Sequence, residues 1–109
     1  MPLSFSLRVV MMPDGKPLVF EQGILIAHEE DKRNWFVMVN GVSVSEEMKQ
    51  SFASGEVFEI IMVPWEGSPF TGKVQIKNLY EEDAYMNGRA PLQEPVQRVI
   101  ELDGEKIPF

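Results

Sequence analysis

Short apolar runs bounded by turn-forming residues recur along the chain, and this pattern constrains the fold more than any other feature of the sequence. In the first run two sets of residues alternate: Leu3, Phe5, Leu7, Val9 and Met11 in one set, and Ser4, Ser6, Arg8 and Val10 in the other. A period of two is typical of a β-strand with one buried face. Further strand-like runs cover residues 17–22, 24–28, 35–39, 56–63, 72–80 and 95–102. The pattern predicts a mainly β protein.

Turn-forming and polar residues separate these runs. The segment PDGK, residues 13–16, predicts a tight turn, after which residues 17–22 would return as a short strand that ends before Gly23. Asn40-Gly41 is the strongest short turn signal, because both residues tolerate the positive φ of a type I′ turn. The polar segments 29–34 and 81–94 predict solvated loops. Asp103-Gly104 predicts a last turn before the apolar end of the sequence.

One helix is predicted over about residues 45–54. Ser43 with Glu46 matches a capping box, and Ser45 followed by Glu46 and Glu47 is an equally good N-terminal cap. Gly55 suits the left-handed conformation that ends many helices. The apolar face of this helix would consist of Val44, Met48 and Phe52.

A chain of 109 residues has the size of a single globular domain with one hydrophobic core. We expect a single-domain antiparallel sandwich or small barrel of about six to eight strands with the one short helix. The alternative is a β-grasp-like α+β sheet with a C-terminal extension.

About a quarter of the sequence shows a resemblance that is relevant to the β-grasp-like alternative. The run VNGVSVS…SGEVFEIIMVPWEGS, residues 39–68, resembles the closing half of the ubiquitin-like sulfur-carrier proteins, in which a Val-Asn strand precedes a Gly-Asp-Glu-Val strand and a Pro-rich exit. Those carriers end in a Gly-Gly tail that is acylated, whereas this chain continues past Gly67. The resemblance therefore implies a β-grasp-like fold but not the carriers' chemistry.

The composition excludes several chemistries. There is no cysteine, so disulfides, thiolate zinc sites and thiol nucleophiles are impossible, and this composition fits a reducing compartment. No serine lies in a GxSxG elbow, and neither common Gly-rich phosphate loop is present. The sequence has no signal-peptide pattern and no apolar run of the roughly 18 residues that a membrane span needs. We expect a soluble cytoplasmic protein that is not an enzyme and uses no cofactor or metal.

His28 is the only histidine, so a hydrolase of the serine type would have to be built around it. It ends an apolar run where an acidic segment begins, which favours a structural position at a strand end. A small hydrolase is therefore the least favoured of the functional interpretations.

The charge is strongly negative, with 17 acidic and 10 basic residues and a net charge of -7. Such a surface should repel phosphate backbones and anionic lipids, so we expect no direct nucleic-acid binding and no membrane partner. The runs 29–31 and 81–83 lack the spacing of a calcium loop and predict solvated faces. An acidic decoy that imitates nucleic acid remains an alternative function, and it requires these two runs to align in one stripe.

The segment MVPWEGSPFTG, residues 62–72, is the first candidate for a partner-binding site. Pro64 should stop the preceding strand, Gly67 and Gly72 should allow tight turns, and Pro69 should stiffen the loop. Trp65 and Phe70 are expected mainly to cap an open end of the core. If Trp65 faces solvent instead, it becomes, with Glu66 beside it, the kind of anchor found at interface hot spots.

Two further candidates contain aromatic residues. Trp35 and Phe36 must point to opposite faces of their strand, so one of them is exposed unless both faces are covered. The acidic segment 80–92 contains Tyr85 and Arg89 and could order on binding a partner. The candidate partner-binding residues are thus Trp65, Glu66, Phe70, Trp35, Tyr85 and Arg89.

These observations favour a non-catalytic protein-protein interaction or assembly module. It would bind a protein partner or a second copy of itself through an exposed strand edge or through the loop around Trp65, so a homo-oligomer is one expected state. The size and the lack of catalytic motifs also fit a small accessory or structural protein of a larger assembly, for example in a phage.

Overall fold

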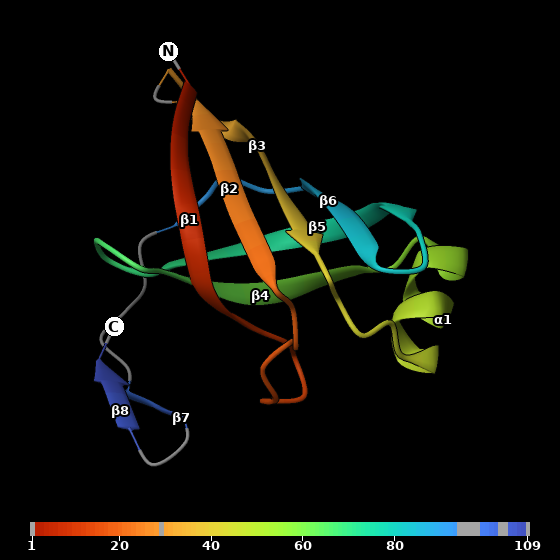
Figure 1. Ribbon diagram of the computed structural model, residues 1–109. Coiled ribbons are helices and arrows are strands. Elements are labelled where there is room, and N and C mark those ends of the chain that lie inside the picture. The colour runs from red at the N-terminus through yellow and green to blue at the C-terminus, as the bar shows by residue number, and fades with distance from the viewer. Residues whose placement is uncertain (1, 29, 94–98, 103–104, 109) are drawn as a thin grey trace.

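Six antiparallel strands close into a barrel in the computed structural model, which describes residues 2–28, 30–93, 99–102 and 105–108 (Figure 1). The strands are β1 (Pro2–Met11), β2 (Gln22–His28), β3 (Asp31–Asn40), β4 (Val57–Pro64), β5 (Phe70–Leu79) and β6 (Asp83–Gly88). Their order is β1-β2-β3-β6-β5-β4, and β4 pairs back with β1. The expected small barrel with one short helix is confirmed, and neither the sandwich nor the β-grasp-like sheet is formed.

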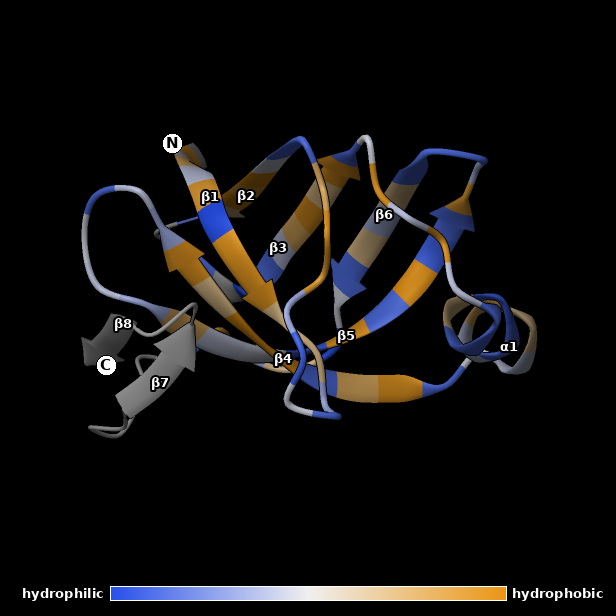
Figure 2. Ribbon diagram, turned by 60° about the horizontal axis from the view of Figure 1, so that its bottom comes forward, coloured by the Kyte–Doolittle hydropathy of each residue, from blue (hydrophilic) through white to orange (hydrophobic). Residues whose placement is uncertain are grey.

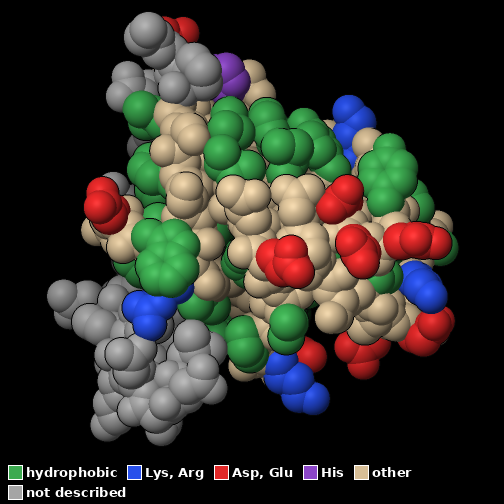
Figure 3. All heavy atoms as spheres, viewed as in Figure 1, with side chains coloured by type: hydrophobic (Ala, Val, Ile, Leu, Met, Phe, Trp, Pro, Cys, Tyr) green, Lys and Arg blue, Asp and Glu red, His purple; other side chains and the backbone are tan. Residues whose placement is uncertain are grey.

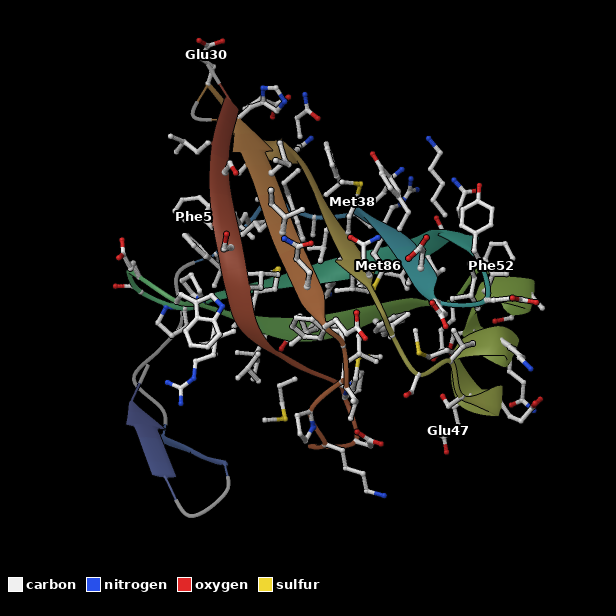
Figure 4. The ribbon with its side chains drawn as sticks, viewed as in Figure 1. Phe5, Glu30, Met38, Glu47, Phe52 and Met86 are labelled. Carbon is white, nitrogen blue, oxygen red and sulfur yellow. The ribbon has the colours of Figure 1, made fainter. Side chains whose placement is uncertain are left out.

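The barrel interior is the hydrophobic core. Alternate residues of each strand point inward, which Figure 2 shows as alternating apolar and polar bands along the ribbons. The largest fully buried side chains come from every strand of the barrel: Val10, Leu25, Val37, Val39, Ile60, Met62, Val74 and Met86. On adjacent strands Met86 is fully buried while Met38 lies on the outer surface (Figure 4).

A β-bulge changes the alternation in β1. The pairing of β1 with β4 shifts between Leu7, opposite Pro64, and Val9, opposite Val63. The extra residue reverses which side chains face inward, so Leu7 and Val10 both join the main core. Val9 and Met11 instead form a second buried cluster with Val63. The expectation that Leu3 to Met11 keep one face throughout is therefore wrong beyond Leu7.

The return strand predicted over residues 17–22 is also wrong. The partner of β1 is β2, which contains Gly23 opposite Leu7. Residues 12–21 form a long connection whose backbone is tied to the barrel, because Leu18 N–H donates to Val10 O at 2.8 Å. A Cβ at Gly23 would lie 2.9 Å from the Phe20 ring, so this glycine makes room for an apolar side chain of the connection.

Two strands lie where polar loops were predicted. Most of segment 29–34 belongs to β3, in which Asp31 pairs with His28 of β2 and lies ahead of the part of β3 that pairs with β6. Segment 81–94 contains β6, in which Ala84 and Met86 are buried between outward-facing neighbours. In β6 the outer-face residues Asp83, Tyr85 and Asn87 obscured the period-two pattern. In the first part of β3, Asp31, Arg33 and Asn34 are all exposed, so the sequence there has no alternation to detect.

The helix α1 (Glu46–Ser54) joins β3 to β4 and is confirmed with its caps. Of the two candidate caps Ser45 is the N-cap, and its Oγ accepts a hydrogen bond from Met48 N at 3.2 Å. Gly55 ends the helix with φ 70°, in the left-handed region. Met48 is buried, whereas Phe52 remains partly exposed on the outer side. The segment after Asn40-Gly41 leads straight into α1 without pairing as a hairpin.

A separate two-stranded antiparallel sheet follows the barrel and consists of β7 (Val99–Leu102) and β8 (Glu105–Pro108). The strand predicted over residues 95–102 is thus present in its second half. Residues 95–98 and the predicted turn at Asp103-Gly104 lie outside the described residues.

Candidate functional site

Trp65 lies in the loop between β4 and β5 and is 68% exposed, so the prediction that it caps the core is wrong. Its backbone is nevertheless fixed, because Trp65 N–H donates to Ser6 O at 3.0 Å. The guanidinium carbon of Arg8 lies 5.7 Å from the centroid of the Trp65 ring, within the range of a cation–π contact. An aromatic ring of this size is held in solvent on an anchored loop.

The rest of the loop explains why it is anchored. Pro64 ends β4, as predicted, and Pro69 is buried just before β5. Gly67 has φ 98°, which lets the chain reverse between these two prolines, and Glu66 is exposed beside Trp65. Phe70 is only partly buried but packs on Phe5, with ring centroids 5.1 Å apart. Phe70 therefore belongs to the rim of the core, whereas Trp65 and Glu66 face solvent.

The edge of β1 beside this loop is open along part of its length. Among the described strands, residues 2–6 pair with β2 only, because pairing with β4 begins at Leu7. Ser6 presents its carbonyl to the side opposite β2, where Trp65 donates to it. The two sides alternate along a strand, so Ser4, which is exposed, presents its N–H and C=O to that same side. A strand edge and an exposed tryptophan therefore lie next to each other.

Trp35 does not lie on the surface, since it is only 3% exposed and belongs to the main core. Its indole Nε1–H donates to Ala90 O at 2.8 Å. A Cβ at Gly72 or at Gly88 would meet atoms of the indole ring, so both glycines leave space for it. Gly72 is thus a packing residue inside β5, and the prediction that it allows a tight turn is wrong. Trp35 cannot serve as a surface anchor for a partner.

The remaining aromatic candidates form a separate outer surface. Phe36 points outward from β3 and stacks on Tyr85 of β6, with ring centroids 5.1 Å apart and planes 17° apart. Lys77 Nζ lies 5.9 Å from the centroid of the Tyr85 ring. Arg89 is exposed after β6, and its backbone N–H donates to Lys73 O. Because β6 is ordered in the free chain, binding is not needed to fold this segment.

The two acidic runs lie at opposite ends of the barrel. Asp31 begins β3, whereas Asp83 pairs with Asn40 at the end of β3. Nine residue steps along a strand separate the two by about 30 Å. Figure 4 shows Glu30 at the upper tip and Glu47 of α1 far below it. The described members of these runs do not form the single stripe that a nucleic-acid mimic requires; Glu29 lies outside the described residues.

His28 ends β2 and is half-buried. The neighbouring carboxylate, Glu29, lies outside the described residues. In the part of the chain that the structure describes, no group of three or more histidine, aspartate and glutamate residues could hold a metal ion. Nor is any helix in that part long and apolar enough to cross a membrane.

A hollow beside α1 was not predicted from the sequence. It has a volume of about 400 Å³ and lies between the β1–β2 connection, α1 and the first residues of β4. The signal that could have revealed it is the connection itself, in which Leu18, Val19 and Phe20 are apolar without a strand's alternation. Leu18 and Phe20 pack against the main core, whereas Val19 is 67% exposed.

The comparisons with known proteins give no significant match. No family model matches the sequence, and neither a curated protein nor a solved structure matches the chain.

Proposed function

We propose that this protein is a non-catalytic interaction module whose binding surface consists of Trp65, Glu66 and the neighbouring edge of β1, residues 2–6. The observation that carries the proposal is Trp65, a large aromatic side chain that is 68% exposed on a loop whose backbone is anchored. Tryptophan is among the residues most enriched at interface hot spots. An anchored loop also loses little conformational entropy on binding, which favours recognition.

The edge of β1 suggests how a partner would bind. An extended segment placed beside residues 2–6 could pair with the N–H and C=O of Ser4 and continue the sheet. Trp65 and Arg8 would then lie at the end of this added strand. At that end the Ser6 carbonyl already accepts a hydrogen bond from Trp65 N–H. Backbone pairing would supply affinity, and the tryptophan would supply specificity. The partner is a second protein or a second copy of this chain.

The test compares Trp65→Ala with Tyr80→Ala. Tyr80 is 65% exposed and lies at the opposite end of β5, which makes it a matched control for loss of an exposed aromatic ring. Both variants should fold with a free energy of unfolding within about 0.5 kcal/mol of the unchanged protein. In quantitative affinity purification from the native cells, a specific partner should be retained by Tyr80→Ala and lost by Trp65→Ala.

One result would count against the proposal. Equal retention of every partner by both variants would remove Trp65 from the interface. Light scattering distinguishes the two kinds of partner, because a monomer over a wide concentration range would exclude self-association and leave only a different protein.

A further inference from the structure

The hollow beside α1 lies at the other end of β4 from Trp65. Residues from three parts of the chain form its walls: the β1–β2 connection, the segment 43–51 that includes the start of α1, and Glu56 and Phe58 around the start of β4. In Figure 1 the connection projects below the barrel, with α1 to its right. A volume of about 400 Å³ falls within the roughly 300–1,000 Å³ range of small-molecule sites.

The floor of the hollow is apolar and preformed. It consists of side chains that also belong to, or pack against, the main core: Met12, Leu18, Met48, Phe58 and Ile76. Because these side chains are held by the core on their inner side, the floor does not have to be created by a ligand. Burying an apolar group there is favourable, since it removes apolar surface of both partners from water.

The backbone of the walls is already hydrogen-bonded within the protein. Ser43 N–H donates to Val19 O at 3.1 Å, and Met12 N–H donates to Lys16 O at 3.0 Å. Leu18 N–H is likewise bonded to Val10 O, so these three backbone donors of the walls are not available to a ligand. A hollow of about 400 Å³ has the size of a compact small molecule and not of an extended peptide of several residues.

The rim carries more negative than positive charge. Three carboxylates, from Asp14, Glu47 and Glu56, surround the opening together with one ammonium group, that of Lys16. Glu56 is oriented by Ser51, whose Oγ donates to Glu56 Oε2 at 3.3 Å. Glu47 projects from the first turn of α1 on the lower side of Figure 4, the side on which the connection lies. Figure 3 shows that acidic side chains also gather over the surface where β6 and α1 lie.

We propose that this hollow binds a small organic cation that has an apolar body and one amine. The apolar body would lie on the floor formed around Met48 and Phe58, and the ammonium group would lie at the rim near Glu47 and Glu56. The negative rim disfavours an organic anion of the same shape, because such a ligand would bring like charges together on desolvation. This site is separate from the Trp65 surface and does not depend on the proposed interaction.

Three probes of the same shape test the role of charge: 4-phenylbutylamine, 4-phenylbutanol and 4-phenylbutyrate. Each is titrated into the ¹⁵N-labelled chain of 109 residues, and backbone amide shifts are followed by NMR. We expect the amine to bind most tightly, the alcohol less tightly, and the acid at least about fivefold more weakly than the amine. The shifts should be confined to residues around the hollow, and added salt should weaken the amine but not the alcohol.

A matched pair of variants tests the rim. Glu47→Gln should weaken the amine by about two- to fourfold and leave the alcohol unchanged, because an exposed charge pair contributes little. Glu46→Gln is the control, since Glu46 is the neighbouring residue in the same turn of α1 but does not line the hollow. Both changes remove one charge near the helix N-terminus, and Glu46→Gln also removes the exposed Lys49–Glu46 ion pair, which contributes little to stability. The difference between the two variants in amine affinity therefore reports on Glu47 at the rim.

Several results would overturn the proposal. The first is binding of the acid as tight as that of the amine, and the second is an equal effect of Glu46→Gln and Glu47→Gln. Shifts that lie away from the hollow would overturn it as well. A short Lys-Phe-Lys peptide amide that binds the hollow more than tenfold tighter than the amine would show that the ligand is a peptide and not a small molecule.

Discussion

The space around Trp35 gives the sharpest prediction about stability. Gly88 of β6 has no Cβ, and a Cβ built there would meet three atoms of the buried indole ring. The backbone of Gly88 does not have a positive φ, so alanine is compatible with the strand itself. In the absence of the ring, Gly88→Ala would stabilise the protein by about 0.4–1 kcal/mol, because alanine restricts the unfolded chain.

With the Trp35 indole in place, Gly88→Ala should instead destabilise the protein. Forcing a methyl group into a well-packed core costs roughly 1–3 kcal/mol. Moving the indole also breaks the 2.8 Å hydrogen bond from Nε1 to Ala90 O. A buried polar group left without its partner costs about 1–3 kcal/mol more. We therefore expect Gly88→Ala to lower the free energy of unfolding by about 3 kcal/mol.

Urea unfolding followed by circular dichroism measures this loss, since fluorescence would report on Trp35 itself. Trp35→Phe supplies the control: with a smaller ring and no N–H, the cost of adding Gly88→Ala should fall below about 1 kcal/mol. A Gly88→Ala protein as stable as the unchanged chain would refute the packing of Trp35 against β6, and so would full additivity of the two changes.

Two predictions concern the ends of α1. Ser45→Ala should cost about 1 kcal/mol in urea unfolding, because it removes the acceptor of the Met48 N–H, whereas Ser43→Ala should change stability by less than about 0.5 kcal/mol. Equal losses of stability in the two variants would mean that Ser45 is not the N-cap. Gly55→Ala should cost about 1–2 kcal/mol, since φ 70° is unfavourable for a residue with a Cβ. An unchanged midpoint would contradict this conformation of Gly55.

Local patterns in the sequence were sufficient for the elements whose determinants are local. The caps of α1 depend on residues within one turn of the helix ends, and Ser45 and Gly55 could be identified from the sequence for that reason. The inward-facing residues of β5, Val74 and Ile76, alternate regularly with polar ones and were assigned to the correct face. Together these elements suffice to predict a small β fold with one helix.

Features that depend on pairing with distant strands could not be predicted in this way. The bulge after Leu7 is defined by its register against β4, more than fifty residues later in the chain, and no residue near Leu7 signals it. β6 was not predicted as a strand, because its two buried residues, Ala84 and Met86, alternate in the sequence with polar residues that face outward. Its place between β3 and β5 arises only when the barrel closes.

Trp65 is exposed where a cap of the core was expected, and Trp35, a candidate partner-binding residue, is buried. Both tryptophans are large apolar side chains, and the sequence alone does not show which of them is buried. Trp35 is buried because glycines on β5 and β6, Gly72 and Gly88, leave room for its ring. Trp65 has no such space, since its loop extends beyond the last paired residue of β4. Burial of a single side chain thus depends on neighbours contributed by other strands.

Site-specific photo-crosslinking tests the central claim most directly, because it captures a partner whose identity is unknown. A photoactivatable phenylalanine is introduced at position 65 or, as the control, at position 80, and cells that naturally contain the protein are irradiated. We predict a discrete crosslinked product from position 65, either with one other protein or with a second copy of the chain, and none from position 80. No product from position 65, or the same products from both positions, would contradict the assignment of the Trp65 surface as a binding site.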